Sequence, residues 1–296
     1  MSIDNLVSII IPTFNREALL KRAIDSVLSQ TINNFEILII DNFSKDNTEM
    51  LIKSYNDERI FFFKNKNNGI IANSRNYGIE RANGNYIAFL DSDDWWESSK
   101  LEKSILALKS FGADLIYHDC YIKGQNLNKR THCRQVKNPV YNDLVFNGNT
   151  LVTSSVVLTR ESLENTRFSE ITSKSGWEDY DLWIELSKKG LKFQRIKEPL
   201  ANYWMGQDNF DNPERILLNI SSMEKSIFED FRLTSSKKPW WPYYTKGIAY
   251  SNLLEKRKSI RNFSQLFLLS SPFSFKIKAL FKILAQIIRI NQYKTG

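Results

Sequence analysis

Three aspartates are crowded into the four positions from Asp91 to Asp94, directly after an apolar run. The run from Tyr86 to Leu90 is apolar, aromatic and β-branched, which predicts a buried strand. Like charges repel at the end of such a strand unless something neutralises them. Mg²⁺ and Mn²⁺ prefer oxygen ligands, and Mg²⁺ is commonly held by one or two carboxylates together with a substrate's phosphates. The cluster therefore suggests a divalent metal site, and the alternative is a set of aspartates that caps a helix beginning near Glu97.

Alternating strands and helices must position this cluster. Short apolar runs predict strands, and amphipathic runs between them predict helices. The strands are expected at residues 7–11, 35–40, 59–63 and 86–90, and the helices at 17–30, 48–55 and 71–82. Such an alternation predicts βαβ units and an α/β fold with a mostly parallel central sheet flanked by helices. Ligands gather outside the carboxyl ends of parallel strands, which is where the aspartates would lie.

The pattern is looser in the second half of the chain. A helix at 100–111 and a strand at 114–117 precede a polar loop or hairpin at 123–138, and a strand is expected at 153–158. Two further helices are expected at 177–188 and 213–231. We predict an α/β domain over residues 1–231, followed by a basic, helical extension over residues 232–296.

Composition places the chain among ordinary globular proteins. Hydrophobic residues make up 42% and charged residues 25% of its 296 residues, which excludes wholesale disorder. The two cysteines form no C-x-x-C pair, so we expect neither a disulfide framework nor a zinc site, and a reducing compartment is favoured. The first residues lack a basic signal-peptide region, and no apolar run approaches the roughly 20 residues of a spanning helix.

Positive charge is concentrated at the end of the chain. From Lys237 onward there are twelve Lys or Arg residues and one acidic residue, which suggests contact with an anionic surface. From Phe273 onward apolar residues repeat on one helical face, with Lys278, Lys282 and Arg289 opposite. Two interpretations remain open for this helix: a membrane-surface helix, or a helix packed on the protein's own core.

Four short blocks occur in a fixed order between Val7 and Trp96. They are Ile-Pro-Thr-Phe-Asn-Arg at 11–16, Asp-Asn-Phe-Ser at 41–44, a block at 68–78 that begins Asn-Gly, and Asp-Ser-Asp-Asp at 91–94. Together they resemble the start of a family 2 glycosyltransferase with the Rossmann-like GT-A fold. The second block departs at two positions from the family's common Asp-Asp-Gly-Ser. The ordered set is specific, although each block alone is weak.

The resemblance implies that these blocks bind a nucleotide diphospho-sugar. The residues assigned to the donor are Pro12, Thr13, Asn15, Arg16, Asp41, Gly69, Arg75, Asp91 and Ser92. The residue types agree with this role, because a strand-end carboxylate can accept hydrogen bonds from a base or ribose and an arginine fork suits a diphosphate. Gly69 permits a close or left-handed backbone. Asp41 as a turn cap and Arg75 as a surface helix residue remain the alternatives.

A second match lies at residues 176–183, Gly-Trp-Glu-Asp-Tyr-Asp-Leu-Trp. It resembles the family's Glu-Asp motif, which supplies the catalytic base of inverting members. The resemblance implies that Asp179 is the base and that Glu178 supports it, with Asp181 a weaker candidate. Inversion needs such a base to take the proton of the acceptor hydroxyl. The alternative is an acidic first turn that favours the helix dipole.

The implied reaction is transfer of a sugar, with inversion, from a nucleotide diphospho-sugar to an acceptor hydroxyl. Mn²⁺ or Mg²⁺ would be bound by Asp93, with Asp91 assisting or contacting the ribose, and the nucleotide is expected to be UDP. Acceptors in similar bacterial proteins are often lipid-linked saccharides of surface polysaccharides such as O-antigen or capsule. We therefore expect a cytoplasmic protein, peripheral on the inner face of the membrane, whose tail meets the anionic leaflet.

Two other function classes remain open. A nucleotidyltransferase on a similar fold would also use carboxylates and a metal, but no glycine-rich basic loop follows the first strand. A basic nucleic-acid-binding protein is conceivable from the tail, yet the tail has no recognition motif, and the aspartates would repel phosphates without a metal. We expect no nucleic-acid partner. The absence of G-x-G-x-x-G and G-x-x-x-x-G-K-S/T also disfavours dinucleotide dehydrogenases and P-loop NTPases.

Overall fold

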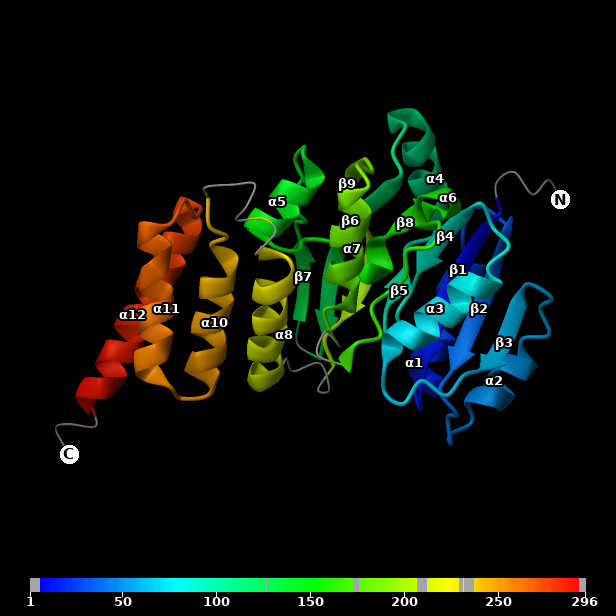
Figure 1. Ribbon diagram of the computed structural model, residues 1–296. Helices are drawn as coiled ribbons and strands as arrows, with labels where there is room; N and C mark the ends of the chain where they lie inside the picture. The colour runs from blue at the N-terminus through cyan, green and yellow to red at the C-terminus, as the bar shows by residue number, and fades with distance from the viewer. Residues whose placement is uncertain are drawn as a thin grey trace. The chain divides into compact units, whose positions relative to one another are not determined.

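The computed structural model describes residues 6–125, 127–172, 176–206, 212–228, 231 and 237–292 (Figure 1). The chain forms two compact units. The first consists of Met1–Val140 and Thr150–Asn209, and the second of Tyr141–Asn149 and Phe210–Gly296. The contacts thus divide the chain near residue 209, whereas we predicted a boundary at residue 231. The difference concerns helix α8 (Pro213–Ser226), which packs against a helix of the second unit.

The first unit begins with parallel strands joined by helices. Its elements are β1 (Val7–Thr13), α1 (Glu17–Leu28), β2 (Phe35–Asp41), α2 (Thr48–Ser54), β3 (Ile60–Lys64), α3 (Ile71–Arg81) and β4 (Tyr86–Phe89). The four strands are parallel in the order β3-β2-β1-β4. Every residue of β1 and β2 is buried, as expected for parallel strands covered on both faces. The predicted α/β fold with its parallel strands and flanking helices is confirmed.

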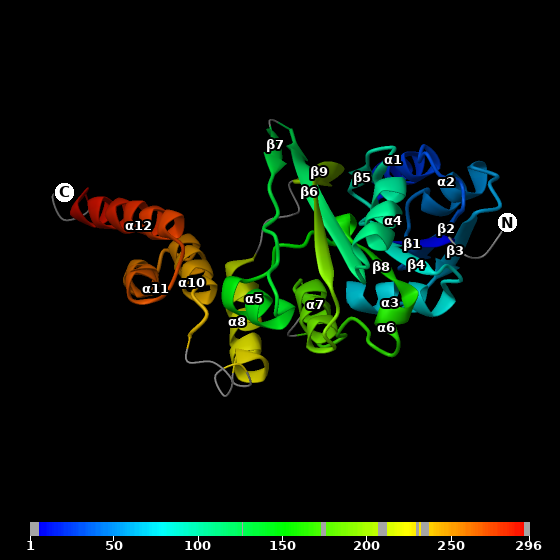
Figure 2. The ribbon, with the colours of Figure 1, turned by 90° about the horizontal axis from the view of Figure 1, so that it is seen from above.

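The sheet continues with strands of both directions. The remaining elements of the first unit are β5 (Trp95–Trp96), α4 (Lys100–Phe111), β6 (Leu115–Gly124), β7 (Leu127–Thr131), the 3₁₀ helix η2 (Thr153–Ser155), β8 (Val157–Thr159), α6 (Arg160–Leu163), α7 (Glu178–Lys188) and β9 (Phe193–Trp204). The full order is β3-β2-β1-β4-β8-β6-β9-β5, with β7 beside β6. Helices α1, α2 and α4 lie on one face, and α3, α6 and α7 on the other (Figure 2).

Several features of this half differ from the sequence-based expectation, including the short elements β5 and α6, which were not predicted. The strand predicted at 153–158 is a strand only from Val157, because residues 153–155 form η2. Strand β9 was not predicted, since its charged residues interrupt the apolar pattern that marks a buried strand. The polar segment predicted as a loop or hairpin contains β7, which pairs antiparallel with β6, so the hairpin prediction is confirmed.

The core of the first unit lies between the sheet and its helices. Side chains such as Ile9, Ile37 and Ala88 from the strands pack with Leu20 and Ile24 of α1, all without solvent exposure. Full burial of one such large apolar side chain contributes about 1.5–3 kcal/mol relative to its exposure. This packing makes the ends of the strands a rigid platform for the polar residues that follow them.

The second unit is helical. It contains α5 (Val140–Asn147), α8, α10 (Trp241–Asn252), α11 (Lys256–Leu268) and α12 (Phe273–Gln292). Helices α10 and α11 approach closely at Gly247, where an added Cβ would lie 2.6 Å from the ring of the buried Phe263. Among the helices of the described residues, none combines the length and the apolar character needed to cross a bilayer.

Candidate active site

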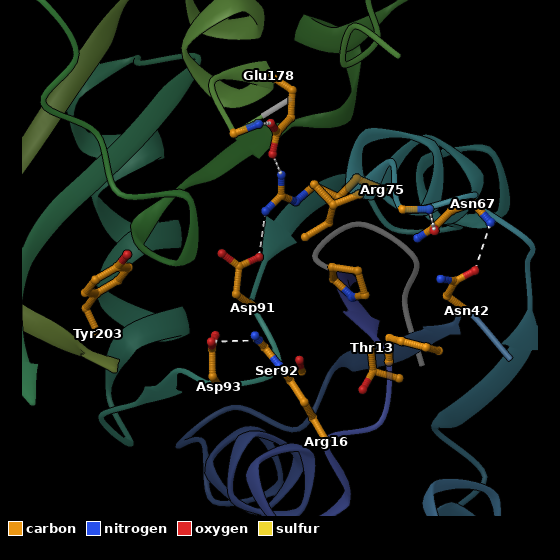
Figure 3. A pocket seen from close by; sticks show the side chains of 15 residues that line it. Thr13, Arg16, Asn42, Asn67, Arg75, Asp91, Ser92, Asp93, Glu178 and Tyr203 are labelled. Carbon is orange, nitrogen blue, oxygen red and sulfur yellow. Dashed lines mark hydrogen bonds and ion pairs between the residues drawn. The ribbon is translucent and has the colours of Figure 1, made fainter. Parts of the chain in front are cut away.

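A pocket of about 440 Å³ opens at the carboxyl ends of β1, β2 and β4 (Figure 3). Its wall contains most of the residues predicted to bind donor or metal: Pro12, Thr13, Arg16, Gly69, Arg75, Asp91, Ser92 and Asp93. It also contains Glu178, which was predicted to support the catalytic base. Residues that the sequence reasoning did not single out complete it, namely Phe14, Asn42, Asn67, Ile71, Gly176 and Tyr203. Three predicted site residues, Asn15, Asp41 and Asp179, are not part of this wall.

One end of the pocket is built from the loops after β1, β2 and β3. Asn42 Oδ1 accepts a hydrogen bond from the Asn67 backbone N–H at 3.0 Å, and Asn67 Oδ1 accepts one from the Gly69 N–H at 2.8 Å. Gly69 has φ +80°, a left-handed conformation that suits glycine. Thr13 Oγ1 is buried and has no hydrogen-bond partner among the described residues. Amide groups and a hydroxyl at this end can recognise a polar ligand.

Asp41 and Asn15 shape this end without lining it. The Asp41 carboxylate is 1% exposed and accepts hydrogen bonds from the backbone N–H and the hydroxyl of Ser44. Asn15 Oδ1 accepts one from the Lys45 N–H at 2.7 Å, and the Asn15 N–H donates to Ser44 Oγ at 2.8 Å. Asp41 therefore caps a turn, the alternative considered from the sequence, and its contact with a nucleotide stays a prediction.

The carboxylates of Asp91 and Asp93 lie at the centre of the pocket, each held by an arginine. Arg75 donates to Asp91 Oδ1 at 2.7 Å, and Arg16 donates to Asp93 Oδ2 at 2.7 Å. Burial raises the pKa of Asp93, the charge of Asp91 raises it further, and Arg16 opposes both effects. The backbone of this turn is held by Arg22, which donates to the Asp93 carbonyl at 2.6 Å.

The third aspartate of the cluster has a structural position. Asp94 is buried and accepts hydrogen bonds from Ser154 Oγ at 2.6 Å and from the Trp204 N–H at 2.8 Å. Burial, followed by the charges of Asp91 and Asp93, raises the pKa of Asp94 well above its usual range. The helix-cap alternative is wrong, since the next helix, α4, begins at Lys100.

The donor set fits a divalent cation that arrives with a diphosphate. Within the described residues, no three His, Cys, Asp or Glu side chains converge to form a cation site. A cation that shares its coordination with substrate phosphates needs only one or two carboxylates. Asp91 and Asp93 both line the pocket, and the repulsion between their carboxylates favours the binding of a cation between them and the substrate.

Arg75 links the end of β4 to the start of α7. It is 3% exposed, and its second terminal nitrogen donates to Glu178 Oε1 at 2.7 Å (Figure 3). Burial alone would lower the pKa of Arg75, but the charges of Asp91 and Glu178 outweigh burial and raise it. Glu178 Oε2 also accepts from the Gly176 N–H at 2.6 Å. Because carboxylates engage both terminal nitrogens, contact of Arg75 with a diphosphate stays a prediction.

Asp179 lies in the first turn of α7, one residue after Glu178. Its Oδ2 accepts a hydrogen bond from Thr153 Oγ1 at 3.0 Å, and its Oδ1 accepts from the Tyr180 N–H at 2.6 Å. Burial and the charge of Glu178 raise the pKa of Asp179 to about 6, against the opposing effect of Arg75. A carboxylate with this pKa is ionised at neutral pH and is a stronger base than an ordinary aspartate.

The residues missed from the sequence differ in how they could have been found. Asn42 and Asn67 lie in loops after predicted strands, so their position at the ligand-binding edge was a usable signal. Tyr203 comes from β9, which was not predicted, and no local pattern marks it.

Comparison with known proteins agrees with this arrangement. Residues 8–166 match the family model for glycosyl transferase family 2. Among curated relatives, the Escherichia coli UDP-Glc:alpha-D-GlcNAc-diphosphoundecaprenol beta-1,3-glucosyltransferase WfaP is 33% identical over 63% of this chain and 72% of its own. The putative teichuronic acid biosynthesis glycosyltransferase TuaG of Bacillus subtilis is 33% identical over 67% of this chain and 78% of its own.

Solved structures share the fold at low sequence identity. S. aureus TarS, residues 1–349 in complex with UDP, gives a TM-score of 0.58 at 16% identity and covers 95% of this chain and 80% of its own. The mannosyltransferase PcManGT from Pyrobaculum calidifontis, in complex with GDP-Man and Mn²⁺, gives 0.55 at 15% identity, covering 98% and 83%. The chain therefore belongs to glycosyl transferase family 2 and is a glycosyltransferase with a GT-A fold.

Proposed function

We propose that this glycosyltransferase transfers a sugar from a UDP-sugar to a hydroxyl group of a lipid-linked saccharide, with inversion, during assembly of a bacterial surface polysaccharide. The observation that carries the proposal is the single pocket in which Arg75 joins Asp91 to Glu178, beside Asp179. The names of WfaP and TuaG support the donor, the lipid-linked acceptor and the polysaccharide.

The donor would lie along the pocket, with its nucleoside towards Thr13, Asn42 and Asn67 and its sugar towards Glu178. Asp93, assisted by Asp91, would hold Mn²⁺ or Mg²⁺. A bound divalent cation neutralises the charge that develops on a departing nucleoside diphosphate. Arg16 and Arg75 keep the two carboxylates in place within the protein.

The acceptor hydroxyl would approach the sugar on the side opposite the diphosphate. Its oxygen attacks the anomeric carbon, the bond from that carbon to the diphosphate oxygen breaks, and Asp179 takes the hydroxyl proton. Direct displacement inverts the anomeric configuration. Glu178 contributes by fixing Arg75, and through it Asp91, at the other side of the reacting bond.

Nucleotide release tests this proposal. UDP-sugars and GDP-mannose are screened as donors. The enzyme should release UDP from a UDP-sugar, and only when Mn²⁺ or Mg²⁺ and a lipid-linked or short synthetic acceptor are both present. UDP release can be followed by a coupled assay, and the anomeric configuration of the product by NMR. Release of pyrophosphate would indicate a nucleotidyltransferase, and full activity in excess chelator would remove the metal from the proposal.

The second unit offers a surface for the membrane that carries such an acceptor. Helix α12 packs through Phe275, whose ring centroid lies 4.6 Å from that of Trp240, and through the buried Ala279. Seven large apolar side chains of α12 are instead 41–77% exposed: Phe273, Ile277, Leu280, Phe281, Leu284, Ile287 and Ile288. We call these seven the α12 stripe.

The stripe and the basic residues around it suit an anionic bilayer. Lys278 and Lys282, which were predicted to lie opposite the apolar face, are exposed on the same helix. The side chain of Arg289, the third residue of that basic face, lies outside the described residues. One face of α12 packs within its unit, while the stripe is exposed. The packed face agrees with the core interpretation of the sequence, and the exposed stripe supports the proposal of a membrane-surface helix. We propose that the stripe inserts into the cytoplasmic leaflet and makes the enzyme peripheral on the inner face of the membrane.

Polar substitution of the stripe should weaken membrane binding. In the triple variant Ile277→Ser, Phe281→Ser, Leu284→Ser, each change removes about 1 kcal/mol of the free energy of membrane insertion. The affinity for the membrane should therefore fall on the order of 100-fold. Cosedimentation with vesicles of phosphatidylglycerol and phosphatidylethanolamine measures this. Leu218→Ser, at an exposed position of α8, is the matched control and should bind normally. Unchanged binding of the triple variant would refute the membrane role of the stripe.

A further inference from the structure

The 3₁₀ helix η2 contacts both groups of carboxylates in the site. It precedes β8, which runs antiparallel to β4 and pairs Val157 with Ala88. This pairing brings the start of β8 to the carboxyl end of β4, so η2 lies beside the turn that holds Asp91 and Asp94. The three side chains of η2 are buried, although all three carry hydroxyl groups, which are costly to bury without hydrogen bonds.

Ser154 is bonded to the turn after β4 at several points. Its Oγ donates to Asp94 Oδ2 at 2.6 Å and accepts from the Asp91 N–H at 3.1 Å. Its carbonyl accepts from Trp96 Nε1 at 2.7 Å. The hydroxyl of Ser154 therefore fixes the backbone from which the two metal-site carboxylates project.

Thr153, the preceding residue, forms a hydrogen bond with Asp179 on the other side of the site. Its Oγ1 donates to Asp179 Oδ2 at 3.0 Å. The charged groups that act on Asp179 are Glu178, which raises its pKa, and Arg75, which lowers it, and the Thr153 hydroxyl also lowers it. A hydroxyl that donates to a carboxylate favours its charged form, which is the form a base requires.

We propose that Thr153 and Ser154 are positioning residues for the transfer reaction proposed above: they hold the base carboxylate of Asp179 and the Asp91–Asp94 turn in one fixed geometry. Adjacent residues of one buried element leave little freedom between the two groups. Rates of displacement depend strongly on such alignment, because a misplacement of about 1 Å can cost about 10²-fold. Neither residue itself lines the pocket, so they act through Asp179 and through Asp91 and Asp94.

Thr153→Val tests the first contact, since it removes the hydroxyl and keeps the shape. The pKa of Asp179 should rise by about one unit, as expected for loss of a hydrogen bond to a charged group. The pKa can be measured by carboxyl ¹³C NMR titration, with Asp179→Asn to assign the signal. The acidic limb of the kcat/KM profile should shift to higher pH by the same amount. Thr153→Ser should restore both the pKa of Asp179 and the pH profile. If the valine variant does not fold, Thr153→Ala replaces it.

Ser154→Ala tests the second contact. Loss of a residue that orients metal-binding carboxylates typically costs about 10- to 100-fold in metal affinity, so Mn²⁺ should bind that much more weakly in the presence of UDP. Water-proton relaxation measures this without catalysis. The NMR pKa of Asp179 should stay at its wild-type value in this variant, because Ser154 does not contact it.

Ser155→Ala is the matched control within η2. Among the described residues, the Ser155 hydroxyl donates only to the Val152 carbonyl, at 2.6 Å. Neither the Asp179 pKa nor Mn²⁺ binding should therefore change. An unchanged pKa in Thr153→Val, unchanged Mn²⁺ affinity in Ser154→Ala, or equal effects in Ser155→Ala would overturn the inference. The NMR pKa and the Mn²⁺ affinity are measured without turnover, so failure of the proposed function can be recognised separately. It would appear in the wild-type enzyme as an acidic limb of the kcat/KM profile whose pKa differs from the NMR pKa of Asp179.

Discussion

Replacing Asp179 with asparagine should lower the single-turnover rate by about 10²- to 10⁴-fold, the usual contribution of a general base. Asparagine keeps the size of the side chain but cannot accept the proton of the acceptor hydroxyl. Binding of UDP should be nearly unchanged, because Asp179 does not line the donor pocket. Rapid-quench measurements of one turnover, with UDP affinity by calorimetry, separate the two effects.

The same prediction has a pH dependence with a defined sign. Burial and the charge of Glu178 raise the pKa of Asp179 to about 6, so the proposed base would be protonated and inactive below that pH. The wild-type rate should therefore rise as pH increases through about 6 and then level off. In Asp179→Asn this limb should vanish.

Two neighbouring carboxyl groups serve as comparisons. Asp181→Asn makes the same chemical change in the same helical turn, outside the pocket wall, and should retain most activity. Glu178→Gln leaves the buried Arg75 with Asp91 as its remaining ion pair, so it should weaken donor binding but slow the chemical step less than Asp179→Asn. A larger rate loss in Glu178→Gln would move the base to that residue. A product of retained configuration would remove the need for any such base.

Asp93→Ala should reduce transfer by about 10³-fold or more, because the proposed metal would lose a carboxylate ligand and the charge that develops on the departing diphosphate would lose its main stabilisation. The fold should persist. Removal of Asp93 relieves its repulsion with Asp91, and the partly exposed Arg16 side chain can be solvated instead. UDP release and thermal unfolding, measured on the same preparation, test both statements.

A control of matched geometry is available outside the pocket. Asp57 forms an ion pair with Arg59 at 2.7 Å, the same distance as the Asp93–Arg16 pair, and Asp57→Ala should leave transfer intact. Normal turnover by Asp93→Ala would exclude its metal role. A large fall in the unfolding temperature of Asp93→Ala alone would instead assign Asp93 to the fold.

The local pattern of the sequence was sufficient for the parallel half of the sheet and for much of the candidate site. Strands β1 and β2 are apolar because both of their faces are buried. A parallel sheet also collects the loop residues that follow its strands at one edge. The aspartates after β4 could therefore be identified as site candidates from residue type and position, whereas the acidic start of α7 was identified by its resemblance to a family motif.

Only the tertiary structure decided which of these groups meet. Arg75 binds Glu178, 103 residues away, and Thr153 binds Asp179 across 26 residues. Asp41 proved to cap a turn while its neighbour Asn42 faces the pocket. Strand β9, which supplies Tyr203, has no clear apolar pattern of its own. Periodicity reports how one segment is buried, whereas these contacts depend on strand order and on the antiparallel pairing of β8 with β4, which are set by packing between distant segments.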